Sequence, residues 1–308
     1  MLFFALFTKQ LSTTTIDSGS TSNLSTAKNF ALFLLFQNGV AFCCKKEYNT
    51  TYFVWYNAEV CEKKEQFVNK IGVITDIHGN LPALVAVLQL LDEQGCNEII
   101  FCGDVVDMGP HGTACFELLC SRKDVTMIVG NHDRDFALDN YYVHPCSHVP
   151  KAHKEYVFAN TDARFKQKVL QMPLFVTRQC GGQTLRFCHY AMVDGVTDIS
   201  SYPFLSLENF PTREIFDRQY KNIQCDAVFF GHKHEPCDIV GDKIYCCVGS
   251  VACHREQLAK AVVIEYDEHS WRYKRVSAPY DATEFTKQLL AMPCGKPIYD
   301  FYYLKITH

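Results

Sequence analysis

The chain has 308 residues, of which 48% are hydrophobic and 21% are charged, and its formal net charge is −4. This length allows one large domain or two smaller ones with an ample core, and the composition is typical of globular proteins. The slight acidity argues against non-specific binding to nucleic acid, which needs a basic surface, although a local basic groove would fit within such a total.

The first 69 residues differ in composition from the rest of the chain. A Ser/Thr-rich stretch covers residues 12–26, and a short apolar run covers residues 30–36. That run is far shorter than the roughly 20 residues that span a bilayer, and the positively charged segment of a secretory signal is missing after Met1. We expect residues 1–69 to form a poorly ordered N-terminal extension. A targeting or interfacial segment, or extra structure packed on the domain, are the alternatives. The folded domain is then expected at residues 70–308.

Sixteen cysteines are scattered along the chain, many of them within apolar runs. Their spacing lacks the paired CxxC pattern that is typical of zinc ribbons. We therefore interpret most of them as buried thiols in a reducing compartment, and we expect the protein to be cytoplasmic.

From Lys70 onward, short apolar runs alternate with polar loops and helical patterns. Apolar runs that start at residues 71, 98 and 125 predict three strands, and helical spacing predicts helices over residues 81–91 and about 113–120. Strands that alternate with helices imply a parallel or mixed sheet with right-handed crossovers. The sequence therefore predicts an α/β fold.

The region after residue 134 first becomes more helical and then, after Pro173, rich in strands. We interpret His144, His148 and His153 in the helical region as surface or structural residues. Further elements are expected as a hairpin over residues 174–179 and 184–188, a helix over 208–220, strands over 227–230, 243–248, 261–266 and 271–276, and a helix over 284–291. This half is expected to supply a second sheet rather than a separate domain.

Polar side chains follow five of the predicted strands, at the point where each strand ends. These residues are Asp76, His78, Asp104, Asn131, His189, His232 and His234. Any one of them alone would be interpreted as a helix cap or a buried structural histidine, but the same coincidence would have to occur at five strand ends. Seven ligands are too many for one ion, and they suit two ions that share a carboxylate, for which Asp104 is the natural bridge.

Imidazole and carboxylate ligands without a thiolate favour manganese, iron or zinc over calcium, and we favour manganese. Two such ions about 3.5–4 Å apart clamp a phosphoryl group and generate a hydroxide for in-line attack. The pattern thus indicates a phosphoryl-transfer site with two divalent metal ions.

The stretches that carry these residues resemble the five motifs of the calcineurin-like metallophosphoesterases, in the same order. They are Asp76-Ile77-His78-Gly79-Asn80, Gly103–Pro110, Gly130–Asp133, the lone His189 and Gly231–His234. The similarity runs from about Lys70 to Tyr266. The first motif and the later Val248–Val251 are most similar to the small stand-alone phosphodiesterase branch.

This resemblance implies a four-layer α/β/β/α sandwich of two mixed sheets. It also implies that one metal ion is held by Asp76, His78, Asp104 and His234, and that the other is held by Asp104, Asn131, His189 and His232.

His132 lies beside Asn131 but is not needed to complete either set of ligands. An imidazolium there would stabilise the developing charge and protonate the leaving alkoxide. By the resemblance, Asp107 would orient and charge His132. Asp133 is a rival for that role, and the residues alone do not choose between them.

Two departures from the family pattern, and one difference from its protein phosphatases, bear on the site. Tyr190 follows His189 where the family usually has Gly, and we expect its side chain at the rim, where it would narrow the site or stack on a substrate base. Cys247-Val248 replaces the usual Asn-Pro before Gly249. Met108-Gly109 replaces the Arg-Gly of the protein phosphatases, which argues against a serine/threonine protein phosphatase.

We therefore predict a hydrolase that uses a dinuclear metal centre and a metal-bound hydroxide to cleave a small phosphodiester or nucleotide. A non-catalytic scaffold with the same fold should have lost ligands or His132, and a nuclease would need a basic groove. A phosphomonoesterase or protein phosphatase of the same superfamily is a further alternative. The expected partner is a small phosphate-ester substrate. We expect the protein to have neither a strong nucleic-acid signature nor a transmembrane helix, and its oligomeric state is left open.

Overall fold

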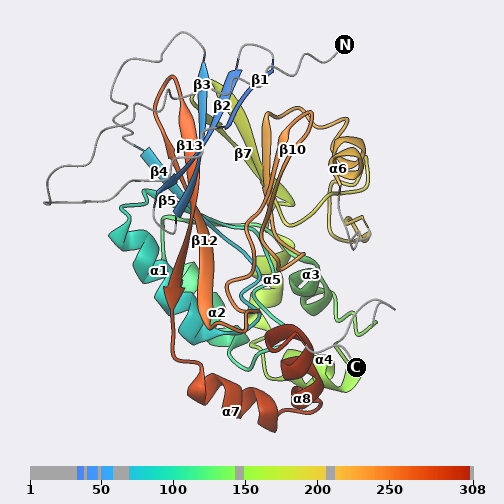
Figure 1. Cartoon of the computed structure of the whole chain (residues 1–308). Coiled ribbons are helices and arrows are strands. Elements are labelled where there is room, and N and C mark those ends of the chain that lie inside the picture. Colours follow the sequence, from blue (N-terminus) through green and yellow to red (C-terminus); the bar gives the residue numbers. More distant parts are fainter. Residues whose placement is uncertain are drawn as a thin grey trace, which may run out of the picture.

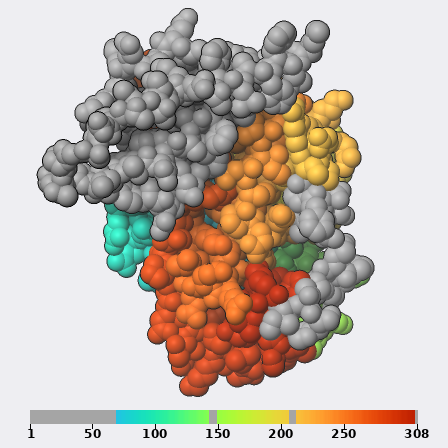
Figure 2. Space-filling model, in the orientation of Figure 1, coloured from blue at the N-terminus to red at the C-terminus, as the bar shows by residue number. Residues whose placement is uncertain are grey.

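The computed structural model describes residues 69–142, 149–205 and 212–305, together with three strands between residues 33 and 57. The strands form one eight-stranded and one five-stranded sheet, with helices outside them (Figure 1). In the space-filling view, the C-terminal part of the chain forms much of the described surface on one face (Figure 2). Within the described ranges, every helix is too short or too polar to cross a lipid bilayer.

The eight-stranded sheet has the order β1-β2-β3-β13-β12-β4-β5-β6. Its strands are β1 (Phe33–Gln37), β2 (Val40–Glu47), β3 (Thr50–Asn57), β4 (Asn69–Ile74), β5 (Glu98–Phe101), β6 (Val125–Met127), β12 (Leu258–Tyr266) and β13 (Trp271–Pro279). Strands β4, β5 and β6 are parallel, whereas β12 is antiparallel to β4. Strand β3 pairs with β13, so that β1, β2 and β3 extend the sheet. The rest of residues 1–68 lies outside the described residues, and the domain boundary near residue 69 stays a prediction.

The five-stranded sheet has the order β10-β11-β9-β8-β7. Its strands are β7 (Phe175–Cys180), β8 (Gln183–Cys188), β9 (Ala227–Phe230), β10 (Cys237–Val240) and β11 (Ile244–Cys247). Strands β8, β9 and β11 are parallel, and the edge strands β7 and β10 are antiparallel to their neighbours. Both sheets are therefore mixed, as predicted.

Eight α-helices connect or follow the described strands, and a π-helix ends the described chain. They are α1 (Leu81–Glu93), α2 (Gly112–Ser121), α3 (Asn131–Ala137), α4 (Lys151–Ala159), α5 (Arg164–Leu170), α6 (Arg213–Gln219), α7 (Thr283–Ala291), α8 (Gly295–Ile298) and the π-helix η1 (Tyr299–Tyr303). Helix α1 begins where the Asn80 side chain accepts a hydrogen bond from the Ala83 N–H at 3.2 Å. Gly95 follows its end with a φ of 73°, a conformation that glycine adopts at low cost.

Alternation along the strands of the first sheet divides its side chains between two interfaces. Ile74 and Ile99 belong to the cluster that includes the buried faces of α1 and α2, whereas Ile71, Val73 and Ile100 belong to the cluster between the sheets. Figure 1 shows α1 and α2 on one side of the sandwich and α6 on the other.

The second sheet alternates in the same way. Phe229 joins the cluster between the sheets, with its ring centroid 5.4 Å from that of Tyr273. Val228 and Phe230 join the outer cluster, where Phe216 of α6 packs on the sheet. These three buried layers of side chains confirm the predicted four-layer α/β/β/α sandwich.

Strands β1, β2 and β3 lie in the stretch that was expected to be a poorly ordered extension, and the structure differs from the predicted elements in two further respects. Strands β12 and β13 return to the first sheet, so the second half of the chain supplies the whole second sheet and also part of the first. The short edge strand β10 and the C-terminal α8 and η1 were not predicted, because they are too short for a periodic signal.

The histidines of the helical region were predicted to be structural or exposed. His153 is buried, and its two ring nitrogens lie 2.6 Å from the Pro293 carbonyl and 2.7 Å from the Met108 carbonyl. It thus connects the C-terminal segment to the loop after β5 and does not join the cluster of candidate ligands. His144 and His148 lie outside the described residues.

Candidate metal centre

All seven predicted ligands follow the carboxyl ends of β4, β5, β6, β8 and β9. Because these strands are parallel within each sheet, their carboxyl ends lie at one edge of that sheet. Two contacts show that the edges of the two sheets meet. The His189 ring nitrogen Nδ1 lies 2.8 Å from the Cys102 carbonyl, and the His232 N–H donates to Asp76 Oδ2 at 3.0 Å.

One group of donor atoms comes from Asp76, His78, Asp104 and His234. The Nε2 atoms of His78 and His234 are 3.0 Å apart, and Asp76 Oδ1 lies 3.5 Å from His234 Nε2. Asp104 Oδ2 lies 3.9 Å from His78 Nε2. These separations are those of atoms that surround a single ion at about 2.0–2.2 Å.

A second group comes from Asp104, Asn131, His189 and His232. Asn131 Oδ1 lies 2.9 Å from His189 Nε2 and 2.8 Å from His232 Nδ1. Asp104 Oδ2 lies 3.1 Å from His189 Nε2. The same carboxylate oxygen therefore lies between both groups, as a bridging ligand would.

The bridging position of Asp104 has an unsatisfied acceptor. Its Oδ1 accepts the His132 N–H at 2.8 Å, but no described residue donates a well-aligned hydrogen bond to the buried Oδ2. A buried carboxylate oxygen without such a partner is costly in free energy. Divalent ions on either side would satisfy it, so the residues present fit the two ions that the resemblance implies.

Contacts behind the histidines fix the nitrogen that each presents to the centre. His78 Nδ1 lies 3.1 Å from the Val106 carbonyl, and His189 Nδ1 faces the Cys102 carbonyl. Since a carbonyl only accepts, both Nδ1 atoms carry a proton, and Nε2 is the nitrogen that each ring presents to the centre. The Thr75 hydroxyl orients Asp76 in the same way, donating to Oδ2 at 2.8 Å.

Burial and neighbouring charges shift the pKa values of His78 and His189 in opposite directions. Burial, and then the neighbouring His234, lower the pKa of His78 to about 4. Burial also acts to lower the pKa of His189, but the Asp104 carboxylate outweighs it and raises that pKa to about 9. A neutral His78 is ready to bind a metal ion, and the positive charge that Asp104 attracts is the charge that such an ion supplies.

His132 lies at the start of α3 beside both groups, with its ring centroid 5.1 Å from that of His78. Its Nδ1 is 2.7 Å from Asp107 Oδ2, and Asp107 is fully buried. Burial lowers the pKa of His132, but the charges of Asp104 and Asp107 outweigh it and raise that pKa. His132 is thus held close to the donor atoms by a carboxylate.

Asp133, the rival partner of His132, faces the backbone instead. Its carboxylate accepts the N–H groups of Asp104 at 2.7 Å, Val105 at 2.8 Å and Gly130 at 3.2 Å. It therefore fixes the loop that carries Asp104 against the start of α3. Of the two acidic residues, Asp107 is the one that contacts the His132 ring.

Much of the centre is built on left-handed backbone. Six of the candidate residues have φ between 45° and 71°, namely Asp76, His78, Asp104, Asp107, His232 and His234. Such residues are uncommon outside glycine and cost about 1–3 kcal/mol each, and they cluster at functional sites. The rest of the fold therefore stabilises a conformation that only the site requires.

Gly231 lets β9 approach β4 closely. A Cβ atom at this position would lie 1.9 Å from Thr75 Oγ1 and 2.6 Å from Asp76 Oδ2. We expect Gly231→Ala to lower the free energy of unfolding by about 1–3 kcal/mol through overpacking and to weaken metal binding by displacing Asp76. Urea unfolding and metal titration measure the two effects.

Gly182→Ala is the control for Gly231→Ala. It has nothing within 4 Å of the added Cβ, and its φ of 75° confines its cost to local strain. It should leave metal binding unchanged. Equal metal affinity in Gly231→Ala and the parent would contradict the need for this close approach.

The expectation that Tyr190 stands at the rim is wrong. Tyr190 is fully buried, and its ring packs 5.1 Å from the His232 ring and 5.9 Å from the Phe230 ring. The buried Tyr190 ring packs against His232 on the side away from solvent. Tyr190 therefore neither narrows the entrance to the site nor contacts a substrate.

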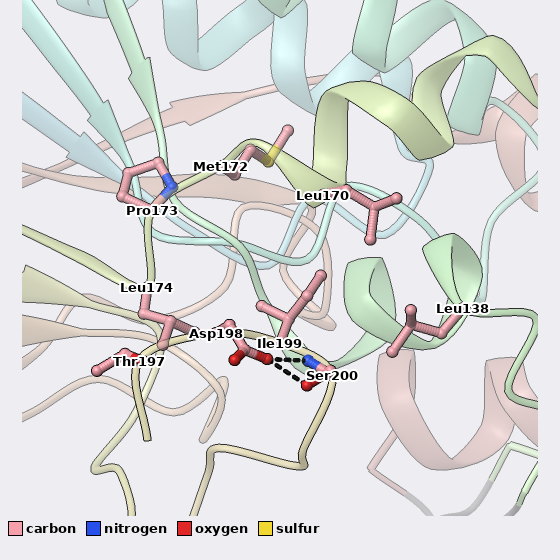
Figure 3. A pocket seen from close by; sticks show the side chains of 9 residues that line it. All are labelled: Leu138, Leu170, Met172, Pro173, Leu174, Thr197, Asp198, Ile199 and Ser200. Atoms are coloured by element: carbon pink, nitrogen blue, oxygen red, sulfur yellow. Dashed lines mark hydrogen bonds between the residues drawn. The ribbon is translucent and has the colours of Figure 1, made fainter. Parts of the chain in front are cut away.

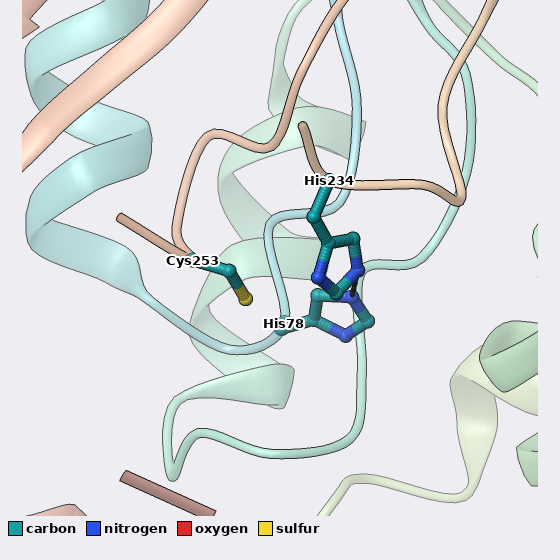
Figure 4. A group of neighbouring side chains, drawn as sticks. All are labelled: His78, His234 and Cys253. Atoms are coloured by element: carbon teal, nitrogen blue, oxygen red, sulfur yellow. Dashed lines mark hydrogen bonds between the residues drawn. The ribbon is translucent and has the colours of Figure 1, made fainter. Parts of the chain in front are cut away.

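Sequence reasoning missed two residues of the loop after β11. The Ser250 hydroxyl donates to the Asp76 carbonyl at 2.7 Å, and the Cys253 thiol lies beside His78 and His234 (Figure 4). Ser250 follows Gly249 in the loop after β11, a sixth strand that is parallel to β9, and this position was a signal for Ser250 but not for Cys253.

A separate pocket of about 270 Å³ lies beside α3 and α5 (Figure 3). Its lining includes Leu138, Leu170, Ile199 and Asp198, and the Asp198 carboxylate accepts the Ser200 N–H at 2.7 Å. None of the candidate ligands lines it, so it is not part of the metal centre.

Known proteins are similar to this chain in sequence or in fold. The chain is 26% identical over 241 residues to the uncharacterized protein MJ0912 of Methanocaldococcus jannaschii, which covers 68% of this chain and 88% of that protein. The fold of the chain is similar to that of a metallophosphoesterase from Sphaerobacter thermophilus, with a TM-score of 0.58 and 20% identity. The match covers 73% of this chain and 95% of that one. The fold is also similar to that of the hypothetical protein PH1004 from Pyrococcus horikoshii OT3, with a TM-score of 0.60, 17% identity and coverage of 77% and 98%.

The family of the chain follows from its match to a sequence model that represents a protein family. The sequence model described as calcineurin-like phosphoesterase matches residues 69–236, which is more than half of the chain. That range contains all seven candidate ligands as well as His132 and Asp107. The chain therefore belongs to the calcineurin-like phosphoesterases.

Proposed function

We propose that the protein is a metal-dependent phosphoesterase that holds two divalent ions and hydrolyses a small phosphodiester or nucleotide. The observation that carries this proposal is the position of Asp104 Oδ2, buried between two groups of nitrogen and oxygen donors. A lone structural ion would need only one such group.

Manganese, iron and zinc all suit these donors. When bound, two such ions polarise phosphoryl oxygens and lower the pKa of a water molecule. Asp76, His78, Asp104 and His234 would hold the first ion, and Asp104, Asn131, His189 and His232 would hold the second.

His132, oriented by Asp107, is the protein residue that donates a proton to the leaving group. Asp107 holds the Nδ1 proton of His132, which leaves Nε2 as the nitrogen that donates a proton to the leaving oxygen. Against the effect of burial, the carboxylates of Asp104 and Asp107 raise the pKa of His132 and so favour the protonated ring. Because Asp107 contacts His132 and not the donor groups, it is a positioning residue.

Asp107→Asn tests this positioning role. The amide keeps the size of the side chain but loses its charge, so we expect kcat to fall by about 10- to 100-fold. KM and metal content should stay within about twofold of the parent, because neither depends on this contact. Steady-state kinetics and metal analysis measure these quantities. A change confined to KM or to metal content would contradict the role.

The substrate class is tested with the purified protein and added manganese, zinc or iron. The panel is bis-p-nitrophenyl phosphate, p-nitrophenyl phosphate, cyclic nucleotides and dinucleoside polyphosphates. Faster hydrolysis of diesters or nucleotides than of the monoester supports the proposal. If the protein binds both ions yet hydrolyses none of these compounds, the hydrolytic function is contradicted and a scaffold role is favoured.

A further inference from the structure

Cys253 brings a thiol to the first group of metal ligands. The sulfur of Cys253 and one ring nitrogen each of His78 and His234 all lie within 4.8 Å of one another, and all three residues are buried. Figure 4 shows the thiol pointing toward the two imidazole rings. The donor set predicted from the sequence contained no thiolate, so this neighbour changes the chemistry of that group.

The loop that carries Cys253 is tied to the ligands themselves. Ser250 Oγ accepts the Cys253 N–H at 2.8 Å and donates to the Asp76 carbonyl. The Ser250 N–H donates to the His234 carbonyl at 2.9 Å, and the Val251 N–H donates to the Thr75 carbonyl at 2.9 Å. These bonds fix the backbone on both sides of the thiol relative to Asp76 and His234, so its position is built into the site.

The immediate surroundings of the thiol suit a soft ligand. Cys253 Sγ is fully buried and lies 3.9 Å from Met108 Sδ, which is at most a weak hydrogen-bond acceptor. With Cys253, the first group offers two imidazoles, one sulfur and the carboxylates of Asp76 and Asp104, and zinc binds all three kinds of donor.

We propose that Cys253 supplies a thiolate ligand to the first metal ion, beside His78 and His234, and that this ligand favours zinc over manganese at that position. The inference rests on the proposed function, since it requires a metal ion in the first group. Zinc binds imidazole nitrogen at about 2.0–2.1 Å and thiolate sulfur at about 2.3 Å, so a sulfur and a nitrogen that share one ion are at most about 4.4 Å apart. The sulfur and both nitrogens lie within 4.8 Å of one another, so a small side-chain movement would let them share one ion.

Binding in this way transfers the thiol proton to solvent, and a sulfur–metal bond replaces the sulfur–hydrogen bond. No oxidation is involved. A soft thiolate prefers zinc and related ions, whereas manganese prefers oxygen donors. No described cysteine sulfur joins the donor atoms of Asp104, His189 and His232 in the second group, so we expect no such preference there.

The test is the absorption spectrum of the full-length protein loaded with Co²⁺, which replaces zinc and reports its ligands. We expect a near-ultraviolet band from charge transfer between thiolate and Co²⁺ in the parent. Cys253→Ser should lose this band while it still binds cobalt. The exposed Cys120→Ser and Cys294→Ser variants are matched controls for adventitious thiolates and should keep it.

Competition between zinc and manganese gives a second readout that does not depend on activity. Cys253→Ser should weaken zinc binding at one site by about tenfold and change manganese binding by less than about twofold. Thermal unfolding shows whether each variant is folded, and Cys253→Ala replaces the serine variant if it is not.

Three outcomes overturn the inference. They are cobalt binding by the parent without the band, a band that survives in Cys253→Ser, and equal loss of zinc and manganese in that variant. The first two leave the metal centre and the proposed function intact. A parent protein that binds no cobalt at all contradicts the proposed function as well.

Discussion

Replacing His132 with alanine is expected to lower kcat by about 10²- to 10⁴-fold while the protein keeps both metal ions. His132 contributes no donor atom to either group, and its ring contacts Asp107 at 2.7 Å. Its loss therefore removes a proton donor without removing a metal ligand. Steady-state kinetics and metal analysis on the same preparation measure both effects.

The dependence on the leaving group separates proton donation from a general disturbance of the site. p-Nitrophenolate leaves readily without a proton, whereas an alkoxide does not. The loss in His132→Ala should therefore be smaller for p-nitrophenyl esters than for an alkyl phosphodiester or a nucleotide. The exposed His269→Ala is the matched control and should behave as the parent. An equal loss for all leaving groups would contradict the role of general acid.

Asp104→Asn is expected to remove both metal ions together, so that the content falls from about two ions per chain to about none and turnover falls to the level of the metal-free protein. The reason is that Oδ2 of this one residue lies at both groups of donors. Metal analysis after gel filtration measures the content. Asp242→Asn, at an exposed carboxylate, is the control.

Stability distinguishes loss of ligation from loss of fold in Asp104→Asn. In the metal-free protein this carboxylate lies 3.1 Å from His189 Nε2 and, against the effect of burial, raises the pKa of His189, so removing its charge leaves that buried imidazole without its partner. The metal-free variant should therefore still unfold in one transition, at a lower temperature than the metal-free parent. Retention of one tightly bound ion in the variant would contradict the bridging role.

Strand ends were the most predictable feature of this molecule. Short apolar runs followed by Asp or His marked β4, β5 and β9, and short loops kept those residues next to the strands. Because the strands are parallel, adjacency in sequence became adjacency in space. Contacts between the sheets, such as that of His189 with Cys102, depend on how two separate layers pack and came only from the structure.

Two local rules would have corrected the sequence interpretation. Side chains alternate along β8, and Cys188 belongs to the outer cluster with α6, so Tyr190 belongs there too and not at the rim. Asp133 is the third residue of α3 after the N-cap Gly130, the position from which a carboxylate accepts backbone N–H groups. That rule assigns Asp133 to the backbone and leaves Asp107 for His132.

Cys253 could not be assigned in this way. It lies in an irregular loop six residues after β11, where neither strand nor helix spacing indicates a direction. Its place beside His78 follows from the hydrogen bonds of Ser250 and Val251, which join the loop after β11 to the residues that follow β4 in the other sheet.

Anomalous diffraction from crystals grown with manganese or zinc tests the metal centre most directly. The expected result is two peaks on either side of the Asp104 carboxylate, about 3.5–4 Å apart, one beside His78 and the other beside His189. A single peak, or peaks away from Asp104, would contradict a centre of two ions held by these seven side chains.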